Sequence, residues 1–172
     1  MRHLWLLRHA KSSWDDPDLD DHDRPLAPRG ERAAAAMASH IARAGVRPQL
    51  VLSSSALRAR RTLGIVLASL GDRVSLEIEI DPLLYTFDAQ VLLERLRSVP
   101  DEVRSLLLVG HNPAVQELAL LVAAGGAPHD RVAGKFPTGA LVTIALPDDP
   151  WTTLGESDAE IEGLVVPRDL ER

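Results

Sequence analysis

The chain is 172 residues long, with 45% hydrophobic and 26% charged residues, proportions that are typical of an ordinary globular protein. It contains no cysteine, which excludes disulfides, thiolate metal ligands and a cysteine nucleophile. A net charge of −6 argues against a general nucleic-acid-binding protein, which normally carries a basic face. The longest apolar run, residues 118–124, is far shorter than the roughly 20 residues of a membrane span. Because no targeting segment is visible either, we expect a cytoplasmic protein that forms one domain over residues 1–172.

The first predicted element is a buried strand at residues 4–7, a short apolar run that leads directly into Arg8 and His9. Ligands of an open α/β sheet bind beyond the carboxyl ends of its strands, which is where this basic pair lies. An unpaired charge beside a hydrophobic core is costly, and a bound anion would remove that cost. The pair therefore predicts an anion site, and specifically a phosphate site built around a histidine.

Residues 14–24 are rich in aspartate and have no apolar periodicity, which predicts a loop. One interpretation is a metal site with oxygen ligands at residues 20–23. The glycine and the spacing of a calcium-binding loop are missing, so a solvated acidic loop is favoured. Arg24, at the end of the loop, is a further candidate for reaching the anion pocket.

A second buried strand is predicted at residues 50–52 and is followed by three serines, 53–55, which are typical caps of a helix N-terminus. Arg58 then lies in the first turn of the helix, where a cation opposes the helix dipole. An anion bound at this helix start would make both features favourable. Arg60 and Arg61 are expected to be solvated surface charges.

The alternating residues 75–80 predict a half-buried strand at an edge of the sheet. Asp81 follows it as a strand end, and Asp88 precedes a helix as its N-cap. A third buried strand at residues 105–109 leads into Gly110 and His111. The remaining predicted elements are helices at residues 28–44, 89–97 and 114–124, a strand at residues 140–146, and a short strand at residues 164–166 within a partly irregular segment, 147–172.

Strands and helices alternate along the chain, which predicts an α/β fold: one three-layer α/β/α sandwich with a mostly parallel central sheet. Parallel strands place their carboxyl ends on the same rim of a sheet. His9, Arg58 and His111 each follow a predicted strand, so we expect them to converge there together with Arg8.

Three motifs resemble those of the histidine phosphatase superfamily, the phosphoglycerate mutase-like group. Residues 7–10, Leu-Arg-His-Ala, are similar to its Arg-His-Gly signature, and residues 54–62 contain its Ser-x-x-x-Arg-Ala-x-x-Thr pattern. Residues 109–113, Val-Gly-His-Asn-Pro, are similar to its second-histidine motif. The alanine after the first histidine and the following Lys-Ser-Ser-Trp resemble the SixA-type phosphohistidine phosphatase branch. The resemblance extends from residue 2 to about residue 146, and it implies a phosphoglycerate mutase-like fold.

The resemblance implies a phosphatase in which His9 attacks phosphorus and carries a covalent phosphohistidine, while Arg8, Arg58 and His111 bind the phosphoryl oxygens. Neither a metal nor a cofactor is implied. Family members that act on alcohol phosphates carry an acidic proton donor after the third strand, and no residue aligns clearly with it here. Asp81 and Asp88 are possible donors, although their ordinary roles as strand end and helix cap are favoured.

A missing acid fits a phosphohistidine substrate, whose imidazole leaving group can bring its own proton. We therefore expect a metal-independent phosphatase that acts on protein phosphohistidine. The alternatives are a phosphomonoesterase for a small phosphorylated molecule and, from another class of protein, a phosphate-binding module without catalysis. The expected partner is accordingly a phosphorylated protein or a small phosphorylated substrate, with no nucleic acid and no membrane.

Overall fold

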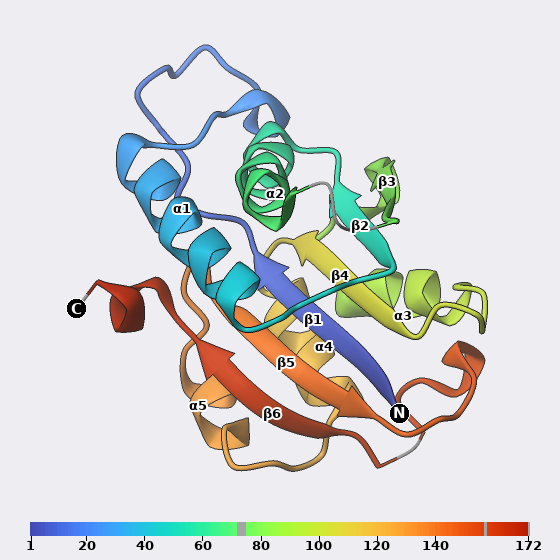
Figure 1. Cartoon of the computed structure of the whole chain (residues 1–172). Coiled ribbons are helices and arrows are strands. Elements are labelled where there is room, and N and C mark those ends of the chain that lie inside the picture. Colours follow the sequence, from blue (N-terminus) through green and yellow to red (C-terminus); the bar gives the residue numbers. More distant parts are fainter. Residues whose placement is uncertain (72–74, 157, 172) are drawn as a thin grey trace.

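The computed structural model describes residues 1–71, 75–156 and 158–171, and these form a six-stranded sheet with the strand order β3-β2-β4-β1-β5-β6 (Figure 1). The pairs β1–β4, β2–β4 and β2–β3 are parallel, whereas β5 runs antiparallel to both β1 and β6. The strands are β1 (Arg2–Arg8), β2 (Leu50–Ser54), β3 (Glu77–Asp81), β4 (Ser105–Gly110), β5 (Leu141–Leu146) and β6 (Glu160–Val165).

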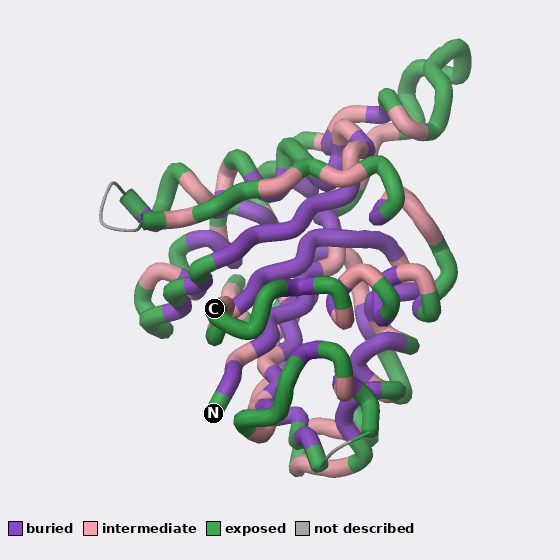
Figure 2. Tube along the Cα trace, turned by 90° about the vertical axis from the view of Figure 1, so that its right-hand side faces the viewer, coloured by how far each residue is buried: buried purple, intermediate pink, exposed green. Residues whose placement is uncertain are grey.

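Helices cover both faces of the sheet (Figure 1). They are α1 (Pro28–Arg43), α2 (Leu57–Leu70), α3 (Ala89–Arg97), α4 (Ala114–Val122) and α5 (His129–Gly134). Because side chains of a strand alternate between its faces, Trp5 and Leu7 join the core beneath α1 and α2, while Leu4 and Leu6 join the core beneath α3 and α4. The central strands are buried along nearly their whole length (Figure 2). The expectation of a single-domain α/β/α sandwich with a mostly parallel sheet is confirmed.

The structure differs from the sequence-based expectation at several elements. The serines at 53–55 do not cap α2: its N-cap is Ala56, without a side-chain hydrogen bond, because Ser54 still belongs to β2. The helix α5 was not expected, and its six residues are too few to show a helical period. The last strand begins at Glu160, four residues earlier than predicted, because its pairing with β5 extends beyond the apolar patch.

The predicted edge strand is present as β3, but its isoleucines are more exposed than a half-buried strand implies: Ile78 and Ile80 are 43% and 45% exposed. In the described ranges, no helix is both long and apolar enough to cross a membrane.

Candidate active site

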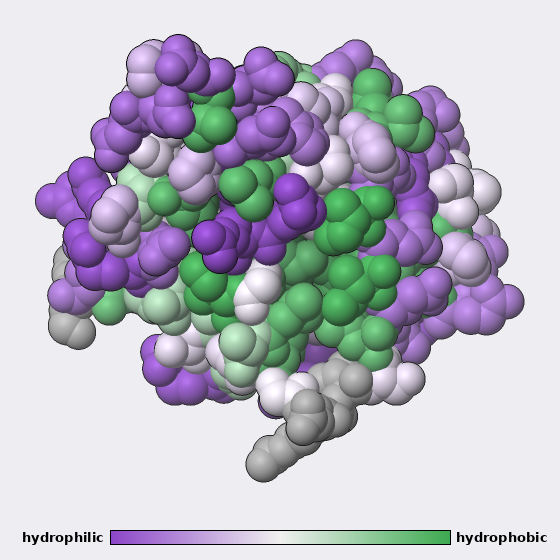
Figure 3. All heavy atoms as spheres, turned by 90° about the horizontal axis from the view of Figure 1, so that it is seen from above, coloured by the Kyte–Doolittle hydropathy of each residue, from purple (hydrophilic) through white to green (hydrophobic). Residues whose placement is uncertain are grey.

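Three neighbouring parallel strands, β2, β4 and β1, end at the same rim of the sheet. The four predicted site residues, Arg8, His9, Arg58 and His111, lie at or just beyond these strand ends. β1 ends at Arg8 and is followed by His9, β4 ends just before His111, and β2 leads into α2, whose first turn carries Arg58. The ring centroids of the two histidines lie 5.1 Å apart. Both histidines and Arg58 are buried. In the view from above, hydrophobic areas lie between hydrophilic ones (Figure 3).

His9 is held as a neutral imidazole with one ring nitrogen free. Its Nδ1 lies 2.6 Å from the carbonyl oxygen of Ala10. A carbonyl only accepts hydrogen bonds, so Nδ1 carries the proton and Nε2 keeps its lone pair. Burial lowers the pKa of His9 to about 4; the bond to Ala10 opposes this shift, and the positive charges of Arg58 and Arg8 add to it. Near neutral pH, Nε2 therefore has a free lone pair, which is what a nucleophile requires.

The ring proton of His111 lies on Nδ1, the nitrogen that does not contact Ser54. The Oγ of Ser54 accepts a hydrogen bond from the backbone N–H of Ala56 at 3.1 Å and lies 2.7 Å from His111 Nε2. Among the described residues Nε2 is the acceptor that the Ser54 hydroxyl proton has, so a satisfied hydroxyl donates to it. With Nε2 accepting, the ring proton lies on Nδ1. Burial, followed by the charges of His9 and Arg58, lowers the pKa of His111 to about 3, so the ring is a neutral donor.

Two buried nitrogens, one on the residue before His9 and one on the neighbouring His111 ring, have no protein acceptor in the described ranges. Among the described residues, Nδ1 of His111 and Nε of Arg8 have no hydrogen-bond partner. The Arg8 guanidinium is itself anchored, since its Nη1 donates to the carbonyl oxygen of Phe136 at 2.9 Å. A buried donor that lacks a partner costs about 1–3 kcal/mol. A phosphoryl group at His9 would supply acceptors for both donors.

Asp21 holds Arg58 in place, a role that the sequence reasoning missed. Arg58 donates from Nη1 to the backbone oxygen of Asp21 at 2.7 Å and from Nη2 to its Oδ2 at 2.9 Å. Arg24 donates to Oδ1 of the same carboxylate at 2.9 Å, and the hydroxyl of Tyr85 also donates to it. Partial burial raises the pKa of Asp21, but these hydrogen bonds outweigh it and keep the pKa below its ordinary range.

The expectation of a simply solvated acidic loop is therefore wrong at this position, because a carboxylate beside two arginines is drawn into an ion-pair network. Arg24 is buried and does reach back from the loop. The described residues contain no cluster of histidine, aspartate and glutamate side chains that could hold a metal ion.

The backbone that follows His9 is fixed from two sides. The N–H of Ala10 donates to Oγ1 of Thr62 at 3.0 Å, and that hydroxyl donates to the backbone oxygen of Arg58 at 2.8 Å. On the other side, α1 approaches so closely that a Cβ on Gly30 would lie 2.0 Å from the carbonyl oxygen of Lys11. The glycine is thus required for this helix to pack against the segment that follows His9.

The two carboxylates named as possible proton donors have structural partners instead. Asp81 accepts a hydrogen bond from the N–H of Leu83 and one from the guanidinium of Arg95. Asp88 is the N-cap of α3, as the sequence predicts. Within the described residues, neither carboxylate makes a hydrogen bond or an ion pair with His9, Arg8, Arg58 or His111.

Aromatic side chains line the site next to His111, and the sequence reasoning did not find them. Tyr85 and Phe87, from the loop before α3, have ring centroids 5.4 Å and 5.9 Å from that of His111 and meet it edge-on. Phe87 is 55% exposed, so it forms an accessible wall beside the histidine. Their position in a loop shortly after a predicted strand end could have identified these two aromatic residues as candidates for the site.

Comparisons with known proteins agree with this geometry. The sequence model of the histidine phosphatase superfamily (branch 1) matches residues 4–99. An uncharacterized protein of Mycobacterium tuberculosis is 34% identical over 94% of this chain and 100% of its own length. An uncharacterized chloroplastic protein of Arabidopsis thaliana is 33% identical over 96% of this chain and 78% of its own length.

Solved structures of similar proteins share the fold. The structure assigned to the phosphohistidine phosphatase SixA of Agrobacterium tumefaciens has a TM-score of 0.78 and 26% identity, covering 96% of this chain and 98% of its own. The corresponding SixA structure of Nakamurella has a TM-score of 0.79 and 27% identity, covering 96% of each chain.

Proposed function

Because the chain belongs to the histidine phosphatase superfamily, in its SixA-type branch, we propose that it removes phosphoryl groups from protein phosphohistidine through a covalent intermediate on His9. The observation that carries the proposal is the pair of buried donors without a protein acceptor, Arg8 Nε and His111 Nδ1, on residues next to a neutral His9. Together they fit the oxygens of a phosphoryl group in front of a nucleophilic nitrogen.

The reaction has two displacements at phosphorus. In the first, the lone pair of His9 Nε2 attacks phosphorus while the bond to the substrate nitrogen breaks; the electron pair of that bond stays on the substrate nitrogen, and the ring, protonated on its other nitrogen, leaves as a neutral imidazole. Arg8, Arg58 and His111 donate to the phosphoryl oxygens, where negative charge must be stabilised during transfer. In the second, water attacks phosphorus, the bond to Nε2 breaks, and inorganic phosphate leaves.

The state of the nearby carboxylates favours phosphohistidine over an alcohol phosphate. An alkoxide leaving group needs a proton from a general acid, and Asp21 is held as an anion by Arg58, Arg24 and Tyr85. Asp81 and Asp88 are engaged as caps. The second ring nitrogen of phosphohistidine can itself carry a proton near neutral pH, and the ring then leaves as a neutral imidazole, so this substrate needs no general acid from the protein.

The test compares a chemically phosphorylated histidine peptide with an aryl phosphate, in the presence of a chelator. We expect much faster turnover of the phosphohistidine peptide and an acid-labile phosphoenzyme, both lost in His9→Ala. The matched control is His40→Ala, which removes a histidine on α1 outside the site and should keep both. Faster turnover of simple phosphate esters would overturn the substrate, and activity that persists in His9→Ala would overturn the nucleophile.

A further inference from the structure

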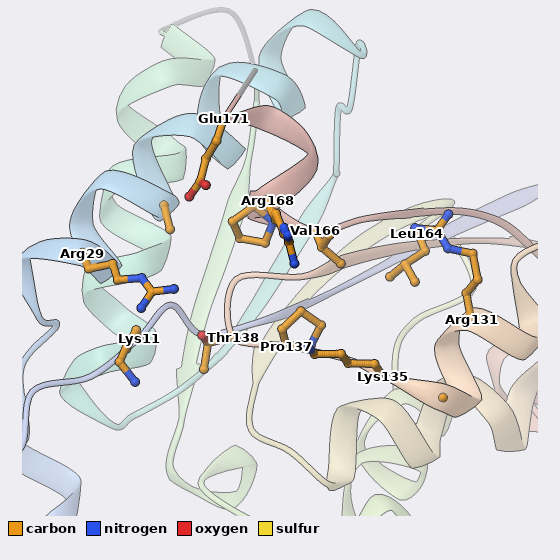
Figure 4. Close-up of a pocket in the computed structure, with 13 residues that line it drawn as sticks. Lys11, Arg29, Arg131, Lys135, Pro137, Thr138, Leu164, Val166, Arg168 and Glu171 are labelled. Atoms are coloured by element: carbon orange, nitrogen blue, oxygen red, sulfur yellow. The ribbon is translucent and has the colours of Figure 1, made fainter.

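A basic pocket of about 770 Å³ opens beside the phosphate site. Its walls carry five cationic side chains and one carboxylate, namely Lys11, Arg29, Arg131, Lys135, Arg168 and Glu171. Figure 4 shows Lys11 and Arg29 on one side, Arg131 and Lys135 on the opposite side, and Arg168 between them. On a chain with a net charge of −6, such a concentration of positive charge is unexpected.

Most of these cations form no ion pair with a carboxylate among the described residues. Arg131 lies 3.8 Å from Asp169. In the part of the chain that the structure describes, no ion pair forms at Lys11, Arg29, Lys135 or Arg168, and all four are exposed. Like charges gathered around one cavity repel each other, so the arrangement favours binding of a negatively charged partner.

The pocket shares a wall with the phosphate site. Lys135, Pro137 and Thr138 line the pocket, and the carbonyl of Phe136, between them in the chain, accepts the hydrogen bond from Arg8. The N–H of Gly139 donates to the backbone oxygens of Arg8 and His9 at 3.1 Å and 3.0 Å. Lys11 is only two residues from His9, a span of at most about 7 Å along the chain. The pocket therefore lies next to the backbone segment that carries Arg8 and His9.

The chemistry of the lining fits a polypeptide. The cations are exposed and stand on separate segments around the opening, whereas a single phosphate is held by donors that converge on one point. Between them lie apolar surfaces of Pro137, Val166 and Pro167. We propose that this basic pocket docks an acidic segment of the phosphorylated protein, with its carboxylates on the cations and an apolar side chain on the prolines. This inference rests on the proposed function.

The probes are synthetic peptides that carry one chemically phosphorylated histidine. In two of them a run of glutamates lies before or after the histidine, and in a third the glutamates are replaced by glutamines. We expect wild type to favour one glutamate peptide over the glutamine peptide by about tenfold in kcat/KM, with the difference in KM. The preference should disappear as salt rises from about 20 mM to about 500 mM, because exposed charges are screened.

The variant Lys135→Glu/Arg168→Glu should lose or reverse this preference, and Lys135→Gln/Arg168→Gln should show a smaller loss. Both side chains are exposed, so neither variant removes buried contacts. The matched control is Arg43→Glu/Arg47→Glu, which makes the same change of charge at two exposed arginines before β2. These arginines do not line the pocket, so this variant should keep the preference.

The outcomes separate the two proposals. If wild type hydrolyses no phosphohistidine peptide in a His9-dependent way, the proposed function fails. If wild type hydrolyses all three peptides equally and the double variant behaves like the control, the docking inference is wrong while the function stands. If the double variant loses the same factor on an aryl phosphate as on the peptides, the pocket serves a small anion, which also overturns the docking of a polypeptide.

Discussion

The substitution Ser54→Ala tests how the protein fixes the proton of His111. The Ser54 hydroxyl links two buried groups, because it accepts from the N–H of Ala56 and donates to His111 Nε2. Without the hydroxyl, the ring proton of His111 can move to Nε2, since the hydrogen bond at one ring nitrogen decides which nitrogen is protonated. His111 would then lose its donor toward the phosphoryl group.

The size of both effects follows from these contacts. Removal of one donor to a transition-state oxyanion costs about 10²–10³ in kcat. Ser54→Ala leaves the His111 ring in place, so we expect a smaller loss of about tenfold in kcat, or about 1.4 kcal/mol. The backbone N–H of Ala56 stays buried without a partner, which lowers the free energy of unfolding by about 1–3 kcal/mol.

Nitrogen-15 NMR of the histidine rings, denaturant unfolding and single-turnover kinetics measure the three consequences. The matched control is Ser53→Ala, which removes a buried hydroxyl from the preceding residue that donates only to the carbonyl of Ser54. We expect this control to keep its activity and the His111 tautomer. A wild-type His111 that carries its proton on Nε2, or full activity in Ser54→Ala, would refute the assignment of Nδ1 as the phosphate donor.

Three further predictions concern protonation, packing and the ion pair. First, kcat/KM should be constant from neutral pH down to about pH 5 and fall as His9 protonates near pH 4. Because the folded-state pKa lies below the ordinary value of 6.5, the unfolded chain binds more protons between these values. The free energy of unfolding should therefore decrease as the pH falls from about 6.5 to about 4, as measured by denaturant titration. Second, Gly30→Ala should destabilise the fold and reduce kcat, since its Cβ would lie 2.0 Å from the backbone oxygen of Lys11. The control Gly64→Ala places a Cβ in open space within α2 and should raise the free energy of unfolding by about 0.5–1 kcal/mol. Thermal denaturation measures both changes. Third, Asp21→Asn should keep the backbone contact to Arg58 but weaken the ion pair. We expect about a tenfold loss in kcat on the phosphohistidine peptide, while the phosphoenzyme still forms. An unchanged kcat would show that Arg58 does not depend on the charge of Asp21.

The sequence predicted the sheet and the residues at its strand ends because both depend on local patterns. Short apolar runs produced β1, β2 and β4 at nearly their observed bounds. Since parallel strands share a rim, the positions of His9, Arg58 and His111 followed from the order of the elements alone. The unfavourable position of Arg58 in the first turn of a helix also predicted correctly that this side chain is not an ordinary surface charge, since it is buried at the site.

The supporting contacts were not predictable in the same way, because they join segments that are distant in sequence. Asp21 contacts Arg58 across 37 residues, and Ser54 contacts His111 across 57. In the sequence, Asp21 is one of several similar aspartates in a polar loop, and Ser54 resembles an ordinary helix cap. Only the fold shows which aspartate meets the arginine and which serine meets the histidine.

The positive charges around His9 would have two opposing effects in the proposed reaction: they attract the phosphoryl oxygens, and they repel one another. In the proposed reaction cations are needed around the phosphoryl oxygens. In the free protein burial lowers the pKa of His9, and the charges of Arg58 and Arg8 lower it further, so the ring stays neutral. The cations must also be prevented from repelling each other. Asp21 balances Arg58 and Arg24 from the loop, and its carboxylate is kept ionised by those contacts. A carboxylate that is held ionised in this way cannot also donate a proton to a leaving group, and this supports our proposal of a substrate whose leaving group needs no acid from the protein.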